Sequence, residues 1–546
     1  MQHSSQQHMP ENTPDSTVKT VVVVGGGNAG WLTAGRIAAE HRIALQKQSP
    51  HHPQQALRVI LIEAPGIAPI GVGEGTWPTM RSTLLALGIR ETDFINACEV
   101  SFKQGAKFAR WVDGSAEDFY YHPLVLPQGF GKTDMAGFWQ HGSQQQAGQQ
   151  QIKGWDWSSF ANDLSYQPAV CEASKAPKTI RHPEYAALAN YAYHLDSGKF
   201  GVFLQKHCIE QLGVEHIVDT VVAVHSQPCG DIAGVETEQH GVIHGDLFVD
   251  CSGFSALLIG KHYQVPFVSC RDVLFIDRAL AVQVPYDSPD AEIASHTIST
   301  AQDAGWIWDI GLQHRRGVGY VYASRYCSDD EAHATLRRYV GPALDQLQVR
   351  PIQINSGHRA HFWHRNCVAV GLAAGFLEPL EASALVLVEL SAQFIAAQLP
   401  ANRQVMDIVA RRFNDTFLYR WQRIIDFLKL HYVLTRRPEP FWQDNCKADT
   451  IPASLQDLLL LWQHRAPGDL DFTSNNEVFP AASYQYVLYG MGFRGQPPAR
   501  AYAPADWDLA LSQLEHNRKL TAQALATLPS HRELLNKIRQ FGLSPV

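Results

Sequence analysis

The stretch Val21-Val22-Val23-Val24-Gly25-Gly26-Gly27-Asn28-Ala29-Gly30-Trp31 decides the fold of this chain. Its β-branched run opens directly into glycines spaced as G-x-G-x-x-G, the fingerprint of a dinucleotide-binding strand, turn and helix. Gly25 permits the tight turn, Gly27 lets backbone approach a pyrophosphate, and Gly30 lets the helix pack closely on its strand. A helix over about residues 29–41 would direct its unpaired amides toward the phosphates. The predicted cofactor contacts here are Gly25, Gly27, Asn28, Ala29 and Gly30.

A second apolar run, Leu57-Arg58-Val59-Ile60-Leu61-Ile62, ends at Glu63, where an acid can bond a ribose hydroxyl. The separation from Gly30 to Glu63 exceeds the usual spacing of about 20 residues. We expect the polar segment 46–55, which contains His and Pro, to be an inserted exposed loop. Short glycine-rich turns also serve as ordinary strand-to-helix corners, so the fingerprint depends on the strand, helix and acid around it.

The bulk composition predicts a folded soluble protein and excludes several classes of partner. The chain has 546 residues, of which 45% are hydrophobic and 18% charged. A net charge of -8 without a lysine-rich stripe argues against nucleic acid. Nine cysteines without metal-type spacing favour a reducing cytoplasm and no metal site. The apolar stretch 384–399 is broken by Glu389 and Gln393, so we expect no membrane span.

Further along, short strand-like runs end in small-residue corners. Runs at 214–218, 221–224 and 234–238 precede a strand that closes on Asp250-Cys251-Ser252-Gly253. A third corner follows at 366–375 and contains Gly371 and Leu372. The corner at 250–253 has an ordinary tight turn as its alternative reading. Three widely separated corners suit FAD better than NAD, and alternating strands and helices predict an α/β fold built on a doubly wound sheet.

The last part of the chain has helical periodicity. Apolar residues recur every three or four positions over 405–432, which predicts an amphipathic helix. We expect its apolar face to pack against the sheet, with no direct role in chemistry. Further helices are expected at 455–463 and 506–527. The segment 466–480, which contains Gly, Pro and Asn, is a candidate substrate loop.

From about Lys19 to the C-terminus, the chain resembles the flavin-dependent tryptophan halogenase family. The most diagnostic element is Trp306-Ile307-Trp308-Asp309-Ile310, which in the family ends in proline but is followed here by Gly311. The other segments that carry the resemblance are 25–31, Gly71-Val72-Gly73-Glu74-Gly75-Thr76, Phe102-Lys103, 250–254 and Phe376-Leu377-Glu378-Pro379-Leu380-Glu381.

The resemblance implies a Rossmann-like FAD-binding domain with an added β-sheet and a mainly helical substrate-side part. We expect a disordered tail over 1–18, which lacks the basic start and apolar core of a secretory signal. An FAD-binding and halogenation core would cover 19–400, with 101–170 contributing to the substrate side. A helical substrate-side region would cover 401–546.

The resemblance also implies a reaction. In the family, FADH2 from a separate flavin reductase reacts with O2 and bound halide, and the resulting hypohalous acid travels to a lysine beside an aromatic substrate. That lysine would be Lys103, which could hold the oxidant by hydrogen bonding or as a haloamine. Glu381 would face the substrate and assist proton loss from the ring or orient the oxidant. The alternatives are a solvated helix for Lys103, and a helix N-terminal charge for Glu381 or Glu378.

The loop 71–76 would be the strap between the flavin and halogenation chambers, with Gly73, Glu74, Gly75 and Thr76 as cofactor contacts. The halide is expected at Ser383 and Ala384, where Ala382-Ser383-Ala384 replaces the family pattern Ser-Thr-Gly. Because the methyl group of Ala384 stands where glycine allows the closest approach, bromide is expected to be handled better than chloride.

The substrate side departs from the members that act on free tryptophan. His122 keeps one wall of the family's aromatic sandwich, Leu124 replaces a phenylalanine, and Phe479 is a candidate opposite wall. His122 could equally be a satisfied core histidine. Trp306 and Trp308 would fill the space between the chambers and block flavin hydroxylation, or simply pack in the core.

The late loop lacks the family's paired tyrosines, and Ser474 falls near the expected acid. Since charge-assisted bonds contribute about 1.5 to 3 kcal/mol each, indole or an indole derivative is favoured over free tryptophan. The chain would act as a monomer or homodimer. Two alternatives stay open, an FAD-dependent aromatic monooxygenase and a non-catalytic flavoprotein scaffold.

Overall fold

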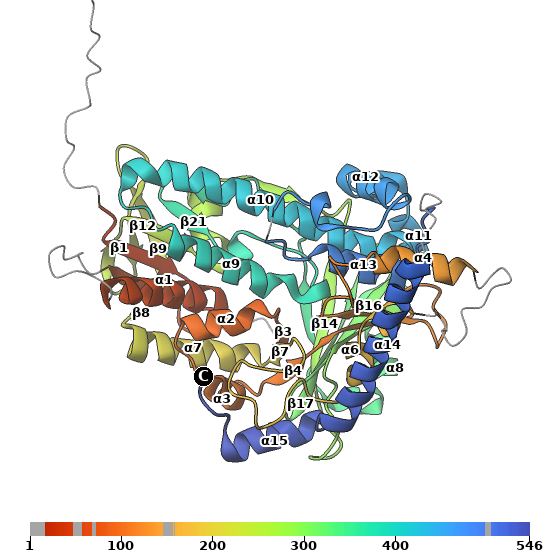
Figure 1. Cartoon of the computed structure of the whole chain (residues 1–546). Helices are drawn as coiled ribbons and strands as arrows, with labels where there is room; N and C mark the ends of the chain where they lie inside the picture. Colours follow the sequence, from red (N-terminus) through yellow and green to blue (C-terminus); the bar gives the residue numbers. More distant parts are fainter. Residues whose placement is uncertain are drawn as a thin grey trace, which may run out of the picture.

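The computed structural model describes residues 17–46, 57–67, 73–145, 157, 159–474, 476–496 and 504–546 (Figure 1). Residues 1–16 of the predicted tail and 47–55 of the predicted insertion lie outside the described residues. The same holds for Gly71 and Val72 of the predicted strap and for Asn475 of the predicted substrate loop.

The glycine fingerprint lies in a six-stranded sheet that is parallel except for one edge strand. Its central strand is flanked by the second strand in sequence on one side and by a much later strand on the other, which is the arrangement of a doubly wound sheet. The predicted α/β fold is confirmed. In spatial order the strands are β20 (Trp363–His364), β21 (Cys367–Ala369), β12 (Leu247–Asp250), β1 (Thr20–Val24), β2 (Arg58–Glu63) and β8 (Glu215–Val218).

A second sheet of seven strands supplies the added β structure. It is antiparallel except where β15 and β5 pair in parallel. Its spatial order is β18 (Arg350–Gln353), β14 (Arg278–Pro285), β17 (Arg315–Tyr322), β16 (Gly305–Gly311), β15 (Thr297–Gln302), β5 (Gly105–Ala109) and β6 (Phe119–Pro123).

Three small sheets of three strands each complete the β structure of the described residues. One of them, β3-β7-β4, carries the predicted strap and the predicted catalytic lysine. The three are β11 (Gly241–His244), β10 (Ile232–Thr237) and β9 (Val221–Ser226); β13 (Phe267–Ser269), β19 (Gly357–Arg359) and β22 (Gly375–Phe376); and β3 (Glu74–Gly75), β7 (Ala192–Leu195) and β4 (Ser101–Lys103).

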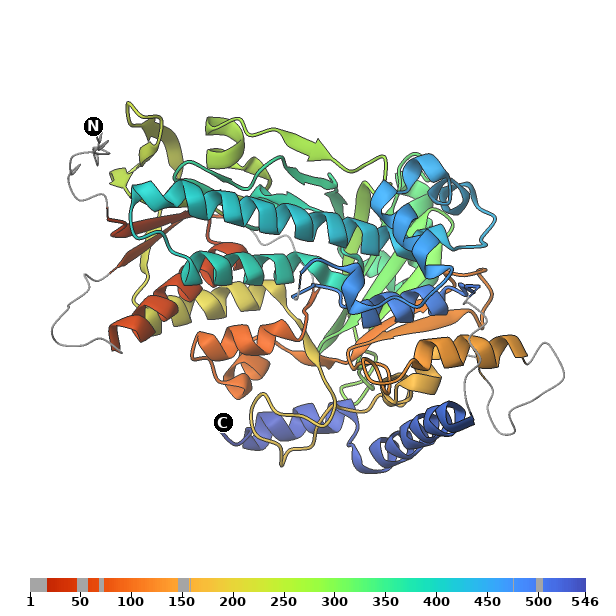
Figure 2. The same cartoon turned by 45° about the horizontal axis from the view of Figure 1, so that its top comes forward.

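Four long helices pack beside the parallel sheet (Figure 1). The helix α1 (Asn28–Gln46) follows the fingerprint and packs against α7 (Ser197–Leu212) and α9 (Ser383–Ala397). The helix α10 (Arg403–Val433) confirms the helix predicted over 405–432 and runs alongside α9 (Figures 1 and 2). Its buried residues include Phe413, Phe417, Trp421, Ile424, Leu428 and Tyr432 of the predicted stripe.

The predicted helices 455–463 and 506–527 correspond to α12 and α14, whereas α13 and α15 were not predicted. The other helices are α2 (Thr79–Ala86), α3 (Glu91–Ala97), α4 (Met135–Gln145), α5 (Phe160–Leu164), α6 (Gln167–Glu172), α8 (Asp329–Val340), α11 (Pro440–Asn445), α12 (Ala453–Trp462), α13 (Ala481–Gly490), α14 (Pro504–Thr527) and α15 (His531–Phe541). Short helical turns are η1 (Gly253–Ser255), η2 (Leu257–His262), η3 (Pro342–Gln346), η4 (Gly371–Ala373), η5 (Leu380–Ala382), η6 (Ala448–Thr450) and η7 (Asp469–Asp471).

One connected hydrophobic core runs through the described residues from Val18 to Leu543. This core includes residues on both sides of position 400, where the sequence predicts the boundary between two regions. That boundary stays a prediction. Among the described residues, the segment Leu380–Ala397 is long and apolar enough to span a membrane by length and composition, and 61% of it is buried inside the fold. It contains α9, which packs against α1 and α2 as a core helix does.

Candidate active site

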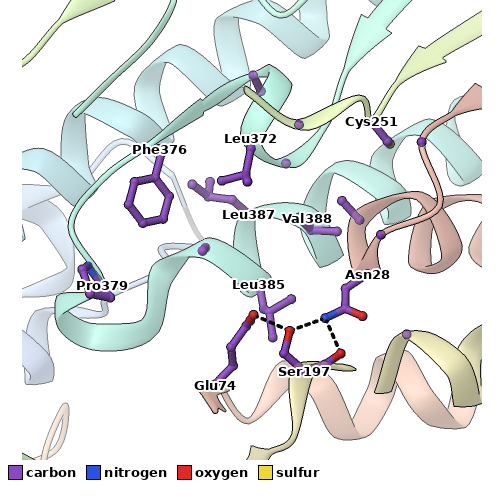
Figure 3. Close-up of a pocket in the computed structure, with 18 of the residues that line it drawn as sticks. Asn28, Glu74, Ser197, Cys251, Leu372, Phe376, Pro379, Leu385, Leu387 and Val388 are labelled. Carbon is purple, nitrogen blue, oxygen red and sulfur yellow. Dashed lines mark hydrogen bonds between the residues drawn. The ribbon is translucent and has the colours of Figure 1, made fainter. Parts of the chain in front are cut away.

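A cavity of about 830 Å³ opens at the carboxyl ends of β1 and β2, where a doubly wound sheet binds its ligand (Figure 3). Its size is that of a cofactor or small-molecule site. Its wall brings together residues that are far apart in the sequence. Of the predicted cofactor residues, those that line it are Gly25, Gly27, Asn28, Ala29, Glu63, Gly73, Glu74, Gly75, Gly371 and Leu372.

The predicted cofactor residues Gly30 and Thr76 do not line the cavity. A Cβ on Gly30 would lie 1.8 Å from the carbonyl oxygen of Gly25, so Gly30 is required by the closeness of turn and helix. Gly25 has a φ of +120°, and a Cβ there would lie 2.2 Å from the carbonyl oxygen of Cys251. The turn after β1 therefore packs directly on the corner after β12. Thr76, the last residue of the strap, is completely buried.

A hydrogen-bonded chain ties the fingerprint to the strap (Figure 3). Asn28, at the start of α1, donates from Nδ2 to the hydroxyl of Ser197 at 2.9 Å and to its carbonyl oxygen at 3.2 Å. The hydroxyl of Ser197 in turn donates to Oε1 of Glu74 at 2.8 Å. Burial raises the pKa of Glu74, and the hydrogen bond from Ser197 opposes that rise. Ser197 was not predicted from the sequence.

The cavity residues fit FAD. Glu63, at the end of β2, lines one end of the cavity, as expected of an acid that binds a ribose. Its Oε2 lies 3.0 Å from Nε2 of His216, which orients the carboxylate. The apolar wall, suited to a flat ring system, includes Leu372, Phe376, Leu385, Leu387 and Val388 (Figure 3).

Lys103 lies on strand β4 and not on a solvated helix, so the alternative reading of this residue is wrong. It lines the cavity, yet the residue is only 2% exposed. Its Nζ donates to the carbonyl oxygen of Thr76 at 3.3 Å and lies 5.5 Å from the ring centroid of Trp77. Burial lowers the pKa of Lys103 to about 8, against the opposing charge of Glu381. The amine is therefore mainly protonated at neutral pH, with a minor neutral fraction that is larger than that of an ordinary lysine.

The strand that carries Lys103 is held from behind by the C-terminal helix α15. The backbone N–H of Phe102 donates to Nε2 of His531 at 2.8 Å, and Nδ1 of His531 bonds the carbonyl oxygen of Ile293 at 3.1 Å. Because β4 pairs with β7 on its other side, Lys103 is fixed in direction by contacts from distant parts of the chain.

Glu381 occupies strained backbone. Its φ and ψ are 63° and 10°, and those of the next residue, Ala382, are 53° and 41°. Two successive non-glycine residues in the left-handed region cost about 1 to 3 kcal/mol each, a strain that marks functional sites. The carboxylate is 1% exposed, which does not fit a solvated charge at a helix end.

Two histidines surround the carboxylate of Glu381. Nδ1 of His122 donates to Oε1 at 2.7 Å, while Nε2 of His431 lies 3.4 Å from the same oxygen. The far nitrogens are also engaged, that of His122 by Ser483 at 2.9 Å and that of His431 by Tyr120 at 2.7 Å. Burial alone would raise the pKa of Glu381, but the charges and hydrogen bonds of His122 and His431 outweigh it and lower the pKa. Glu381 is therefore a carboxylate in the folded protein.

Of the predicted substrate residues, His122 and Phe479 are buried and Leu124 is half-buried. His122, Leu124 and Phe479 do not line the cavity. The ring of Phe479 stacks on Phe427 at 3.9 Å between centroids, and Phe427 lies 5.6 Å from His122. Phe427 thus packs against both predicted walls. Of the two readings of His122, the structure supports a satisfied buried histidine that also holds Glu381.

Trp306 and Trp308 line the cavity from β16, together with Ile310, because alternate strand residues share a face. The indole N–H of Trp306 donates to the hydroxyl of Tyr432 at 3.0 Å, and that hydroxyl donates to Glu378. Burial raises the pKa of Glu378 to about 7. Trp306 therefore connects the wall of the cavity to a buried polar network.

The predicted halide segment lies at the start of α9. Ala384 lines the cavity, whereas Ser383 does not. No side chain caps this helix N-terminus, which leaves its first amides available to an anion. A Cβ on Gly75 would lie 3.3 Å from that of Ala382 and 3.6 Å from Nζ of Lys103, so strap, amine and halide segment meet at one point.

The helix α10 corrects the expectation that its apolar stripe only packs against the sheet. Phe413, Phe417 and Trp421 line the cavity, and Tyr432 bonds Trp306 and Glu378. Periodicity shows which face of a helix is buried but not whether that face meets a core or a cavity.

Several functional candidates were missed by the sequence reasoning. Trp77 gave the clearest available signal, because it directly follows the quoted strap motif. The others reach the site from distant elements and had no motif to mark them; they are Ser197, Phe427, His431 and Tyr432. Within the described residues, no group of three or more His, Cys, Asp or Glu side chains could hold a metal ion.

The chain is similar in sequence and in structure to known halogenases. A sequence profile of the family described as tryptophan halogenase covers residues 20–506. The 7-chloro-L-tryptophan 6-halogenase KtzR of Kutzneria sp. (strain 744) is 33% identical, over 95% of this chain and 99% of its own length. The crystal structure of a tryptophan halogenase from Shewanella frigidimarina NCIMB 400 superposes with a TM-score of 0.90 at 45% identity, covering 97% of this chain and 99% of that one. BrvH, a flavin-dependent halogenase from Brevundimonas sp. BAL3, superposes with a TM-score of 0.80 at 30% identity, covering 96% of this chain and 100% of that one.

Proposed function

The chain belongs to the tryptophan halogenase family and is a flavin-dependent halogenase, and from this premise we propose that it halogenates an indole lacking the zwitterion of free tryptophan. Bound FADH2, delivered by a separate flavin reductase, would supply hypohalous acid from O2 and halide. The observation that carries the proposal is the meeting of Lys103, Glu381 and the start of α9 at one end of the cavity that fits FAD.

Lys103 receives the oxidant in this proposal. Its amine is buried, faces the cavity and is held by the carbonyl oxygen of Thr76. A protonated amine can donate a hydrogen bond to hypohalous acid, and a neutral amine can carry the halogen as a haloamine. The pKa of about 8 makes both forms available near neutral pH. Burial by the surrounding strands keeps the oxidant from bulk water.

Glu381 removes the proton that the aromatic ring releases, or orients the oxidant. A carboxylate is suited to the first task only while it is ionised, and the lowered pKa of Glu381 keeps it so. His122 acts as its positioning residue, because the hydrogen bond from Nδ1 fixes one carboxylate oxygen. The strained backbone at Glu381 is tolerated because these contacts hold it.

The first amides of α9, beside Ser383 and Ala384, hold the halide. The positive end of the helix favours an anion, and Ala384 faces the cavity. The methyl group of Ala384 keeps an anion farther from backbone than glycine would. We expect this spacing to favour bromide, which is larger and more easily oxidised than chloride.

The late loop supports an indole over free tryptophan. Two of its acids are already engaged, since Glu477 accepts from the hydroxyl of Tyr419 at 2.6 Å and Asp471 pairs with Arg465. An ammonium group would have to share these carboxylates with the partners that they already have. Electron-rich rings without such a charge avoid the loss.

The organisation and setting of the enzyme are also proposals. Residues 19–400 would form the FAD-binding and halogenation core, and 401–546 the substrate-side region, which also closes one wall of the cavity through α10. All nine cysteines are free, which suits the reducing cytoplasm. A monomer or a homodimer would serve equally.

The test combines the protein with FAD, a flavin reductase, NADH, O2 and halide. Indole, indole derivatives, phenols and free tryptophan are offered in parallel, and products are read by mass spectrometry. Halogenated indole formed faster than halogenated tryptophan is the expected result. Faster halogenation of free tryptophan would overturn the substrate assignment. Hydroxylated product without halogen would identify a monooxygenase, and no product at all a flavin-binding scaffold.

A further inference from the structure

An indole of the chain itself lies among the groups proposed to surround the substrate. The ring of Trp77 has its centroid 5.5 Å from the amine of Lys103. Its ring lies 5.7 Å from His122 and 5.1 Å from Phe479, the two predicted walls of the substrate site. Its Nε1–H donates to the carbonyl oxygen of Glu381 at 2.7 Å. Trp77 is 7% exposed and is therefore shielded from bulk solvent.

The contacts of Trp77 favour attack by an electrophile. Donation of its N–H to a carbonyl oxygen adds electron density to the indole, which is already the most electron-rich side chain. The amine of Lys103 lies over the ring of Trp77, 5.5 Å from its centroid, so a halogen bonded to this nitrogen is within reach of the ring. Small distances between reacting groups convert an encounter into an intramolecular step.

We propose that Trp77 is a site of self-halogenation, modified by the enzyme's own hypohalous acid when no aromatic substrate is present. The inference rests on the proposed function, since that activity supplies the oxidant. An added aromatic substrate that consumes the oxidant held at Lys103 protects Trp77. The chain thus carries its own competing substrate.

The step balances as an electrophilic aromatic substitution. A ring carbon of Trp77 bonds the halogen of hypohalous acid while the oxygen–halogen bond breaks. The ring then loses its proton, which joins the released hydroxide as water. The ring is oxidised by two electrons and the halogen is reduced, so no further reactant is needed.

Other tryptophans provide internal comparisons. Trp306 and Trp308 line the same cavity, where the oxidant is made, but neither is placed over the amine of Lys103. Modification of Trp77 should therefore depend on Lys103, whereas modification of Trp306 and Trp308 should not. Buried Trp442, which bonds the carbonyl oxygen of Gln302 and lies against Arg437 instead of Lys103, should stay unmodified.

The experiment is peptide mapping after turnover without substrate. Trypsin releases residues 59–81, a peptide that contains Trp77 but no other tryptophan and no tyrosine. The protein is supplied with FAD, reductase, NADH, O2 and the halide that it incorporates into indole in a parallel reaction. Excess free methionine traps oxidant that escapes into solvent. Lys103→Ala, Lys103→Met and Trp77→Phe are mapped beside the unaltered protein.

The expected result is halogen on the 59–81 peptide, suppressed by indole and absent in Trp77→Phe. In both Lys103 variants the halogenated fraction should fall about tenfold or more, provided that FAD still binds. If indole is halogenated in the parallel reaction while the 59–81 peptide stays unmodified, self-halogenation is overturned and the proposed function stands. Label spread over surface residues and removed by methionine would also overturn it. Absence of halogen from both indole and every peptide would refute the proposed function, and the inference with it.

Discussion

Nδ1 of His122 lies 2.7 Å from Oε1 of Glu381, and both side chains are almost completely buried. The contact joins a residue of β6 to the strained turn before α9, which are distant in sequence. It fixes the direction of the carboxylate and keeps it ionised at the point where Lys103 meets the cavity. The predictions below begin with this carboxylate.

Glu381→Gln should slow halogenation by about 10²-fold or more, because an amide cannot accept the ring proton. FAD affinity should change little, since the isosteric amide can still bond His122. Product formation and flavin binding are measured side by side. Glu378→Gln is the matched control, and its halogenation rate should fall far less. The raised pKa of about 7 keeps Glu378 largely protonated below that pH, so the amide changes its charge little. Equal rates for Glu381→Gln and the unaltered enzyme would remove Glu381 from the mechanism.

The free energy of unfolding should decrease as pH rises, because the buried carboxyl group of Glu389 loses its proton. Burial raises its pKa to about 8 from an ordinary value of 4.5, although Thr83 donates to it at 2.6 Å. Between these two values the folded state binds more protons than the unfolded state, so the free energy of unfolding decreases with pH. The full contribution is present below about pH 4.5 and lost above about pH 8.

Urea unfolding of the protein and of Glu389→Gln from pH 5 to pH 9 measures this effect. The difference between the two should change by a few kcal/mol, on the order set by the pKa shift. Parallel curves for the two proteins would show that Glu389 does not titrate in this range.

Gly30→Ala should destabilise the fold, because its Cβ would meet the carbonyl oxygen of Gly25 at 1.8 Å. Backbone cannot move aside there without separating α1 from β1. Gly27→Ala is the matched control, since a Cβ at Gly27 meets nothing within 4 Å. Thermal melting without FAD should show a drop of several degrees for Gly30→Ala and almost none for Gly27→Ala. A similar Tm for both variants would contradict the packing argument.

Halide choice should respond to residue 384. With bromide and chloride at equal concentration, brominated product should exceed chlorinated product. Ala384→Gly should shift the ratio toward chloride, because an anion can then approach the first amides of α9 more closely. Both products are quantified from one reaction by mass spectrometry. Chloride incorporated in excess by the unaltered enzyme would refute the proposed preference.

Local sequence was sufficient to place the glycine turn and Glu63 at the wall of the cavity. The glycines at 25, 27 and 30 and the acid at Glu63 act through backbone geometry and strand order, both of which a short motif determines. The same is true of α10, whose apolar period predicted its length to within a few residues. These features needed no knowledge of distant contacts.

The halogenation side was less predictable because it is assembled from contacts between distant segments. Lys103 was identified by resemblance, but its burial depends on β7 and α15, and α15 was not predicted. The packing of Phe427 against His122 and Phe479 depends on how α10 and α13 meet, which neither helix encodes alone.

The most direct test of the account is product formation by Lys103→Ala with FAD, reductase, NADH, O2 and bromide. Flavin binding and NADH consumption are followed in the same sample as brominated indole. The account predicts that flavin binds and NADH is consumed while brominated indole is not formed, because the oxidant has no amine to receive it. Brominated indole formed at the rate of the unaltered enzyme would contradict the central role of Lys103.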